Sequence, residues 1–219
     1  MKHLFVLIVF LTATSMAWAA TTSNNRQDSI VYLGISPVGI HIPTLATRPI
    51  SLGVYLGDFL VGAEYGKFSY NVTDNTSSAS ADFTNLGGYV RWFPGNSFNV
   101  LLALHKRSWD ARAKVSYTDT ATTLTAQADA QLKADAQVVT VGIGHQWIMD
   151  FGLVIGMDWL VISSGLSTTS SGTINSAQLA TLQPSEKAQT EKELADLGEV
   201  LNKLSSVGGI AILSLGWSF

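Results

Sequence analysis

The chain has 219 residues, with 13 basic and 16 acidic side chains and a formal net charge of −3. This small acidic surplus excludes the strongly basic surface on which nucleic-acid binding depends. Cysteine is absent, which excludes a disulfide framework and a lipid-attachment cysteine. Charged residues form only 13% of the chain, against ~25% in ordinary soluble domains.

The first 20 residues have the pattern of a secretory signal peptide. Lys2 precedes an apolar run from Leu4 to Leu11, and Ala17-Trp18-Ala19 fits the small-x-small rule for cleavage. An N-terminal membrane helix is the alternative, but the run is shorter than the ~20 residues that a span needs. We therefore expect 1–20 to be a signal peptide and 21–29 to be a short N-terminal segment.

No apolar run in the rest of the chain is long enough for a membrane-spanning helix. The longest run extends from Phe151 to Ile162 and contains Asp158. Few charges, many glycines and no spanning helix together indicate a membrane β-barrel, because a closed barrel is the other structure that satisfies its backbone hydrogen bonds in lipid.

Eight segments alternate between apolar and small or polar residues, which is the two-residue period of a β-strand. In one of them, Val141 and Ile143 alternate with Gly142 and Gly144. Glycine and serine recur on the less apolar face, where small side chains suit the narrow interior of a barrel. The segments are approximately 30–40, 49–57, 60–70, 83–93, 98–110, 136–148, 151–163 and 207–219.

The connections between these segments alternate in length. Tight turns are predicted at 58–59, 94–97 and 149–150, and longer connections at 41–48, 71–82, 111–135 and 164–206. Membrane barrels have short periplasmic turns and long external loops. The order predicts eight antiparallel strands with both termini, and therefore the segment 21–29, in the periplasm.

The connection 111–135 is predicted to be an external hairpin. Leu124, Ala126 and Ala128 alternate with polar residues, so we expect the two flanking strands to continue and to turn near 119–121. An alanine-rich helix is the alternative, since alanine is the best helix former. The apolar face changes phase between Val138 and Val139, which suggests a bulge where the hairpin leaves the lipid.

The connection 164–206 contains a predicted helix at 184–204. Pro184 suits a first helical turn, and four leucines fall on one stripe, Leu194, Leu197, Leu201 and Leu204. A helix of this length is marginal alone in water, so the stripe needs a surface to cover. Two uses stay open: the helix caps its own barrel, or it presents a binding face to a surface partner at 164–206.

The last strand ends on an aromatic residue. Trp217 and Phe219 are suited to the interface between lipid and water, where aromatic girdles lie. This ending resembles the C-terminal signature of bacterial outer-membrane barrels, a terminal aromatic residue preceded by apolar residues at every second position, which here are Ala211, Leu213, Leu215 and Trp217. The resemblance implies that Phe219, Trp217 and Leu215 form the signal read by the barrel-assembly machinery.

The architecture resembles the small eight-stranded barrels of the OmpA/OmpX type over residues 30–219, with the helical connection as a departure. We therefore expect an all-β fold: a closed antiparallel eight-stranded transmembrane β-barrel with a helical insertion in the last external loop. The implied location is the outer membrane of a Gram-negative-type bacterium, in contact with its lipid and lipopolysaccharide.

Strand phase places four charged side chains in the barrel interior, Glu64, Arg91, Arg107 and Asp158. We expect two ionic layers, one of Glu64 with Arg91 and one of Arg107 with Asp158, because an unpaired charge in this narrow space costs several kcal/mol. Two interpretations stay open. The inward salt bridges of OmpA-type barrels suggest a gate, and the simpler interpretation is a satisfied polar core.

Basic residues gather where the strand at 98–110 leaves the membrane, and they include Lys106, Arg112 and Lys114. These cations are suited to the phosphates of lipopolysaccharide. A solvated base of the hairpin is the alternative.

No catalytic or metal site is predicted. His41, His105 and His145 show no spacing with carboxylates that indicates zinc, and the loop acids have no calcium-loop register. We expect no enzyme activity, no cofactor and no metal, and a structural or surface-interaction role through the external loops. The alternatives are a narrow pore or conduit for small hydrophobic molecules, a lipid-modifying enzyme, and a soluble lipocalin-like barrel with its apolar face inward.

Overall fold

The structure is a computed structural model that describes residues 22–40, 47–74, 77–118, 125–176, 184–205 and 209–219. The predicted signal peptide, His41 and the predicted hairpin turn at 119–121 lie outside these residues. None of the described helices is long and apolar enough to cross a membrane.

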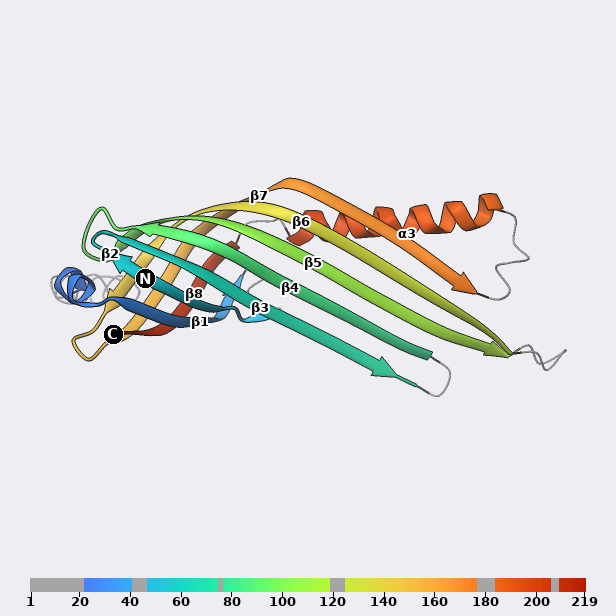
Figure 1. The fold of residues 1–219 in the computed structure, drawn as a ribbon, viewed down its shortest axis with the longest axis horizontal. Coiled ribbons are helices and arrows are strands. Elements are labelled where there is room, and N and C mark those ends of the chain that lie inside the picture. The colour runs from blue at the N-terminus through green and yellow to red at the C-terminus, as the bar shows by residue number, and fades with distance from the viewer. Residues whose placement is uncertain (1–21, 41–46, 75–76, 119–124, 177–183, 206–208) are drawn as a thin grey trace, which may run out of the picture.

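Eight antiparallel strands close into one ring, in chain order, with the last strand paired to the first. This confirms the predicted all-β closed barrel (Figure 1). The strands are β1 (Val31–Ile40), β2 (Ile50–Leu56), β3 (Phe59–Thr73), β4 (Ser77–Trp92), β5 (Phe98–Thr118), β6 (Thr125–Ile148), β7 (Leu153–Ser176) and β8 (Gly209–Ser218).

The ring closes where the C-terminus meets β1. Leu33 and Trp217 are register partners there. The Phe219 amide donates to the Val31 carbonyl at 3.0 Å, and the Ile30 amide donates to the Phe219 carbonyl at 2.6 Å. The last residue is therefore part of the ladder that removes the open edge of the sheet.

Five strands are long: β5 and β6 continue as expected, and β3, β4 and β7 are longer than predicted. β3 to β7 extend beyond β1, β2 and β8 as an open sheet (Figure 1). The predicted loop at 71–82 is mostly strand, β7 continues to Ser176, and the alanine-rich segment belongs to β6 and is not a helix. We call this extension the protruding sheet; it comprises residues 67–73, 77–84, 108–118, 125–137 and 167–176.

The strand ends at 71–82 and 164–176 were missed because they lack clear apolar alternation. Serine and threonine dominate both faces of the segment 167–173. Beyond the barrel neither face has to be strictly apolar, so the two-residue pattern fades although the backbone pairing continues.

Glycine shapes two of the tight turns at the opposite end of the barrel. Gly57 has φ +61° in the turn between β2 and β3, and Gly152 has φ +91° before β7. These left-handed conformations are accessible to glycine at little cost. The first turn is centred on Gly57 and Asp58, one residue earlier than predicted.

A helical segment at 22–28 covers this turn end of the barrel, and the sequence analysis assigned it no structure. Arg26 is only 1% exposed. Its guanidinium donates to the Asn96 carbonyl at 2.7 Å and to Asp58 Oδ1 at 3.2 Å. It also lies over the Phe93 ring, 4.5 Å from the centroid.

The same segment contacts the turn between β6 and β7. Asn25 Nδ2 donates to the Ile148 carbonyl at 2.9 Å and to Asp150 Oδ1 at 3.0 Å. The Ile148 amide donates to Thr22 Oγ1 at 3.4 Å. The segment 22–28 thus binds all three tight turns and closes this end of the barrel (Figure 1).

The helix α3 (Pro184–Ser205) packs on the face of β6 and β7 that continues the barrel interior, which we call the inner face. Gly198 is buried against this face, and a Cβ atom placed there would lie 2.9 Å from Leu132 Cδ1 and 2.9 Å from Ser170 Cβ. Glycine therefore permits the close approach of helix and sheet.

Leu197 of the predicted leucine stripe points away from the packing face of α3, and Leu201 is half-buried. Leu197 is 51% exposed, whereas Gly198 and Asn202 are buried. Asn202 Nδ2 donates to the Asp135 carbonyl at 3.2 Å and the Thr169 carbonyl at 3.3 Å. The helix thus approaches the sheet through small and polar side chains, while the side chains of Leu194 and Leu204 lie outside the described residues.

The change of apolar phase near Val138 now has a physical cause. The buried residues of β6 include Thr140, Val138, Ala136 and Ala134, which lie on one unbroken inner face. Below Val138 the apolar residues point outward, and above it they point inward toward α3. The predicted bulge is in the neighbouring strand, where Leu166 of β7 has no register partner.

We expect Gly198→Val to displace α3 from the protruding sheet. The added side chain overpacks the contact with Leu132 and Ser170, although valine is a better helix former than glycine. Limited proteolysis should show faster cleavage within 184–205 with the strand content of the barrel unchanged. Val200→Ala, at a position on α3 that is 49% exposed, is the matched control; equal cleavage of both variants would contradict this packing.

Candidate functional site

A band of exposed apolar side chains surrounds the barrel. The outward positions of β2 are representative: Leu52, Val54 and Leu56 are all exposed, while Ser51, Gly53 and Tyr55 between them are buried. Each of the remaining seven strands also contributes exposed side chains to the band. They include Leu33, Val61, Leu86, Leu102, Leu104, Val141, Ile143, Ile162, Leu213 and Leu215. The apolar surface of this barrel is therefore on its outside.

Aromatic rings gather at the turn end of this band. The His145 ring stacks on Trp147 with centroids 5.4 Å apart and lies 4.5 Å from the Trp159 ring. Trp159 is the extra residue of β7 at a register shift, without a register partner on β6. Its ring therefore lies at the same level of the barrel as His145. Phe151 and Trp217 form an edge contact with centroids 5.9 Å apart.

His145 also has a serine neighbour. Ser97 Oγ lies 2.9 Å from His145 Nδ1, and among the described residues no carboxylate is hydrogen-bonded to the ring, as the orienting group of a triad is. No group of side chains in the described part of the chain is suited to hold a metal ion.

The interior is filled by an apolar layer near the turns. Tyr32, Tyr55 and Tyr89 belong to one buried cluster, together with Leu60, Phe93, Leu101, Ala103, Ile148 and Val154. A glycine leaves room for a tyrosine ring there: a Cβ atom at Gly62 would lie 2.6 Å from Tyr89 Cζ. This layer blocks the interior above the segment 22–28.

A paired arginine and aspartate adjoin this layer, since Leu60 and Leu101 are the register partners of the arginine, Arg91. Arg91 of β4 donates through Nη1 and Nη2 to the two carboxylate oxygens of Asp158 on β7, at 2.5 Å and 2.7 Å. Arg91 Nη1 also donates to Asn99 Oδ1 at 2.8 Å. The bidentate geometry uses the full planar fork of the guanidinium.

The second cluster is built around Glu64. His105 Nε2 lies 2.8 Å from Glu64 Oε1, and Asn85 Nδ2 donates to the same oxygen at 2.9 Å. Arg107 Nε donates to Asn85 Oδ1 at 3.3 Å. The carboxylate is therefore linked to the buried guanidinium through an amide.

The four predicted side chains line the interior, but they are grouped differently from the two predicted layers. Asp158 pairs with Arg91 and not with Arg107, and the direct partner of Glu64 is His105. The prediction took the height of each charge in the barrel from its position along its own strand. Strand tilt and register, however, decide which side chains meet. His105 is the partner of Glu64 that the sequence analysis missed.

A glycine separates the partners in each cluster. Glu64, Gly87 and His105 are register partners on β3, β4 and β5, so the imidazole reaches the carboxylate across a position without a side chain. Asn99, Gly144 and Asp158 are aligned in the same way on β5, β6 and β7.

Little free space is left between the clusters. The interior cavity has a volume of about 50 Å³, lined by members of both clusters and by Tyr32, Tyr89 and Ser214. Because a water molecule needs roughly 30 Å³ of liquid volume, this space holds about one or two waters. The described side chains thus leave little room for water in this part of the interior.

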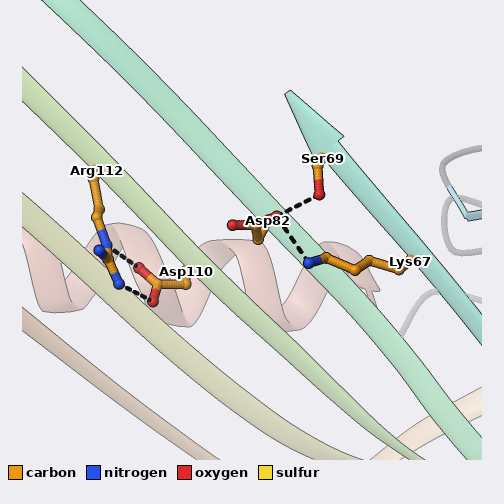
Figure 2. A network of polar contacts seen from close by, with 5 residues as sticks. All are labelled: Lys67, Ser69, Asp82, Asp110 and Arg112. Carbon is orange, nitrogen blue, oxygen red and sulfur yellow. Dashed lines mark hydrogen bonds and ion pairs between the residues drawn. The ribbon is translucent and has the colours of Figure 1, made fainter. Parts of the chain in front are cut away.

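The outer face of the protruding sheet, which points away from α3, is polar. Lys67 Nζ lies 3.5 Å from Asp82 Oδ1, and Arg112 donates to both oxygens of Asp110 at 3.1 Å and 3.0 Å. Figure 2 shows these residues in front of the sheet with α3 behind it. The Arg112 guanidinium lowers the pKa of the Asp110 carboxyl, so this pair is ionised at neutral pH.

The three predicted lipopolysaccharide contacts lie on one face of β5, but in different surroundings. Lys106 is exposed two residues from Leu104 of the apolar band. Arg112 is paired with Asp110, and Lys114 Nζ lies 3.9 Å from Asp129 Oδ1, well above the band.

No protein-family model matches the chain, and no curated protein matches it. The chain is similar to the crystal structure of CarO from Acinetobacter baumannii, with 10% sequence identity and a TM-score of 0.44, over 87% of this chain and 97% of that chain. The fold is therefore assigned from the strand pairing of this chain itself.

We expect Asp158→Asn to destabilise the barrel by about 3–5 kcal/mol, because it leaves the Arg91 charge buried without its counterion. Urea unfolding followed by tryptophan fluorescence measures the change. The double variant Arg91→Met/Asp158→Leu should recover most of the loss, since it removes both charges. A loss as large for Asp82→Asn, an exposed control, would contradict a special role of the buried pair.

Proposed function

We propose that this chain is an integral outer-membrane barrel of a Gram-negative-type bacterium. The observation that carries the proposal is the reversed distribution of polarity: exposed apolar side chains surround a closed ring whose interior holds ion pairs. Such a surface is insoluble in water and matches hydrocarbon.

The dimensions of the band support the proposal. On β6 the outward residues run from Val139 to Trp147, close to the ~9–11 residues of a tilted membrane-spanning strand. The aromatic cluster around His145 lies at one end of this span, as aromatic girdles do. In this orientation the tight turns and segment 22–28 are periplasmic, and the protruding sheet is outside the cell.

We assign the C-terminal residues Leu215, Trp217 and Phe219 to recognition by the barrel-assembly machinery. Their side chains are exposed on the outer face of the last strand. β8 pairs with β1 and closes the ring. Its recognition by the assembly machinery before closure is compatible with this final position.

The role that these features support is structural and surface-interacting. Exposed apolar side chains on the α3 side of the protruding sheet lie outside the band, on β3 and on α3: Phe68, Tyr70, Val72, Leu197 and Val200. Exposed apolar groups of this kind are typical of contact surfaces. We propose that the protruding sheet and α3 present this surface to a partner outside the cell.

Membrane insertion is tested by placing a charge in the apolar band. Val141→Arg should reduce folding stability in lipid vesicles by about 2–4 kcal/mol, because arginine in the hydrocarbon region is costly. Gln137→Arg is the matched control, on the outer face of the same strand but above the band, and should change stability little. The readouts are urea unfolding and heat-modifiable migration in detergent gels.

Two results would contradict membrane insertion. The first is a wild-type chain that stays folded and soluble without detergent, which would instead support a secreted barrel. The second is a Val141→Arg variant as stable in vesicles as Gln137→Arg.

The interior supports a closed barrel over a narrow pore. We expect planar-bilayer recordings of the wild type to show no discrete conductance steps, and Arg26→Ala to stay closed as well. The reason is that the tyrosine layer and the ion pairs block the interior independently of the segment 22–28. Discrete steps that change in Glu64→Ala would support the pore instead.

A further inference from the structure

A groove of about 510 Å³ lies on the outer face of the protruding sheet, a volume within the ~300–1,000 Å³ of small-molecule sites. Two successive rows of register partners line it. One row is Asn71, Ser80, Arg112, Gln131 and Thr173, and the next is Thr73, Ser78, Lys114 and Asp129.

The lining excludes an apolar ligand. Its only apolar members are three alanines that lie between the two rows, at positions 79, 113 and 130. The remaining side chains supply hydroxyl, amide, carboxylate and cationic groups, which are donors and acceptors for a ligand rich in hydroxyls. Arg112 is neutralised by Asp110 beside the groove, whereas Lys114 is not hydrogen-bonded to the groove carboxylate Asp129, so Lys114 is available to a ligand that also carries negative charge.

Lys114 is the cation best placed for such a ligand. Its Nζ atom lies 3.9 Å from Asp129 Oδ1, which is beyond hydrogen-bond distance, and its side chain is half exposed. Arg112 keeps a bidentate bond to Asp110, and that bond fixes the guanidinium on the floor beside Ser80.

The distance of the groove from the apolar band determines which part of a membrane lipid can reach it. Leu104, on the outer face of β5, is the exposed apolar residue nearest to the groove on that strand, and Arg112 is eight residues further along it. At about 3.3 Å per residue and a tilt of 35–45°, Arg112 is about 20 Å above the band. Lys106, about 7 Å along the strand from Leu104, is at the level of lipid headgroups.

The outer face of β5 is continuous from the apolar band to the groove. Leu102, Leu104, Lys106 and Arg112 all point to this side, because β5 pairs with β4 and β6 without a register shift. An amphiphile with acyl chains on the band, phosphate beside Lys106 and sugars in the groove contacts the whole face.

We propose that this groove binds the anionic oligosaccharide of a glycolipid in the same leaflet, and the proposal rests on the outer-membrane location proposed above. The acyl chains anchor the ligand at the band, and Arg112, Lys114 and the hydroxyl and amide side chains bind its sugars. The site thus holds lipopolysaccharide at its core oligosaccharide, in addition to its phosphates.

The test compares two double variants that each remove two cations from the same outer face. Arg112→Gln/Lys114→Gln alters the groove, and Lys67→Gln/Lys133→Gln, outside it, is the matched control. Titration calorimetry in one detergent measures binding of three probes: lipopolysaccharide with its core, lipid A without core, and the free core oligosaccharide.

The groove variant should bind core-bearing lipopolysaccharide about tenfold or more weakly, because charge-assisted hydrogen bonds are lost. The control variant should change by less than about twofold, and both should bind lipid A as the wild type does. Equal weakening by the two variants overturns the groove, because it shows unspecific attraction. If the free core oligosaccharide binds as tightly as the glycolipid, the proposal that the ligand is a glycolipid anchored in the membrane is contradicted.

The experiments distinguish a wrong binding site from a wrong cellular location. All variants are first checked for heat-modifiable migration, which reports the folded barrel. A heat-modifiable wild type that binds core-bearing lipopolysaccharide no better than lipid A overturns the groove alone. A wild type that is soluble without detergent overturns the outer-membrane location and the glycolipid proposal with it.

Discussion

The narrow interior of a closed eight-stranded ring is the constraint on which this structure depends. Space there is too small for bulk water, so each inward charge must find its counterion on another strand. Bidentate pairing of Arg91 with Asp158 and the link from Glu64 to His105 meet this need. Both arrangements depend on a position without a side chain: Gly87 lies between Glu64 and His105, and a Cβ atom at Gly144 would lie 2.6 Å from Asp158 Oδ1. The glycine-rich inner face and the charged core are thus two parts of one solution.

The same closure explains where apolar residues lie in the rest of the chain. While all eight strands are present, the interior is filled by its own side chains and the apolar residues point outward. Above the ends of β1, β2 and β8 the ring is open, and the inner face of the long strands loses its enclosure. The helix α3 covers part of that face, at Leu132 and Ala134. This is why the apolar phase of β6 reverses at Val138 while its pleat does not.

Alternation, the low charge and the order of short and long connections were enough to predict the closed eight-stranded ring, its polarity and the inward direction of all four interior charges. It could not predict the partners, because pairing depends on register and tilt, which link residues far apart in sequence. The packing face of α3 was missed for a related reason: a leucine stripe suggests burial, but close approach to a sheet of alanines requires Gly198 and Asn202. The segment 22–28 has no apolar period, and its position depends on individual side-chain hydrogen bonds donated by Arg26 and Asn25.

The two ends of the barrel are therefore unlike in what they offer to other molecules. At the turn end, the Arg26 guanidinium bonds to Asn96 and Asp58 and the tyrosine layer fills the interior, so little space is left for a solute in transit. At the other end the protruding sheet has two different faces, because a sheet outside the ring is solvated on both sides unless something covers it. One face keeps apolar side chains beside α3, and the opposite face keeps rows of hydroxyl, amide and charged groups around Arg112. The contacts with other molecules that we propose therefore lie on those two faces, beyond the closed part of the barrel.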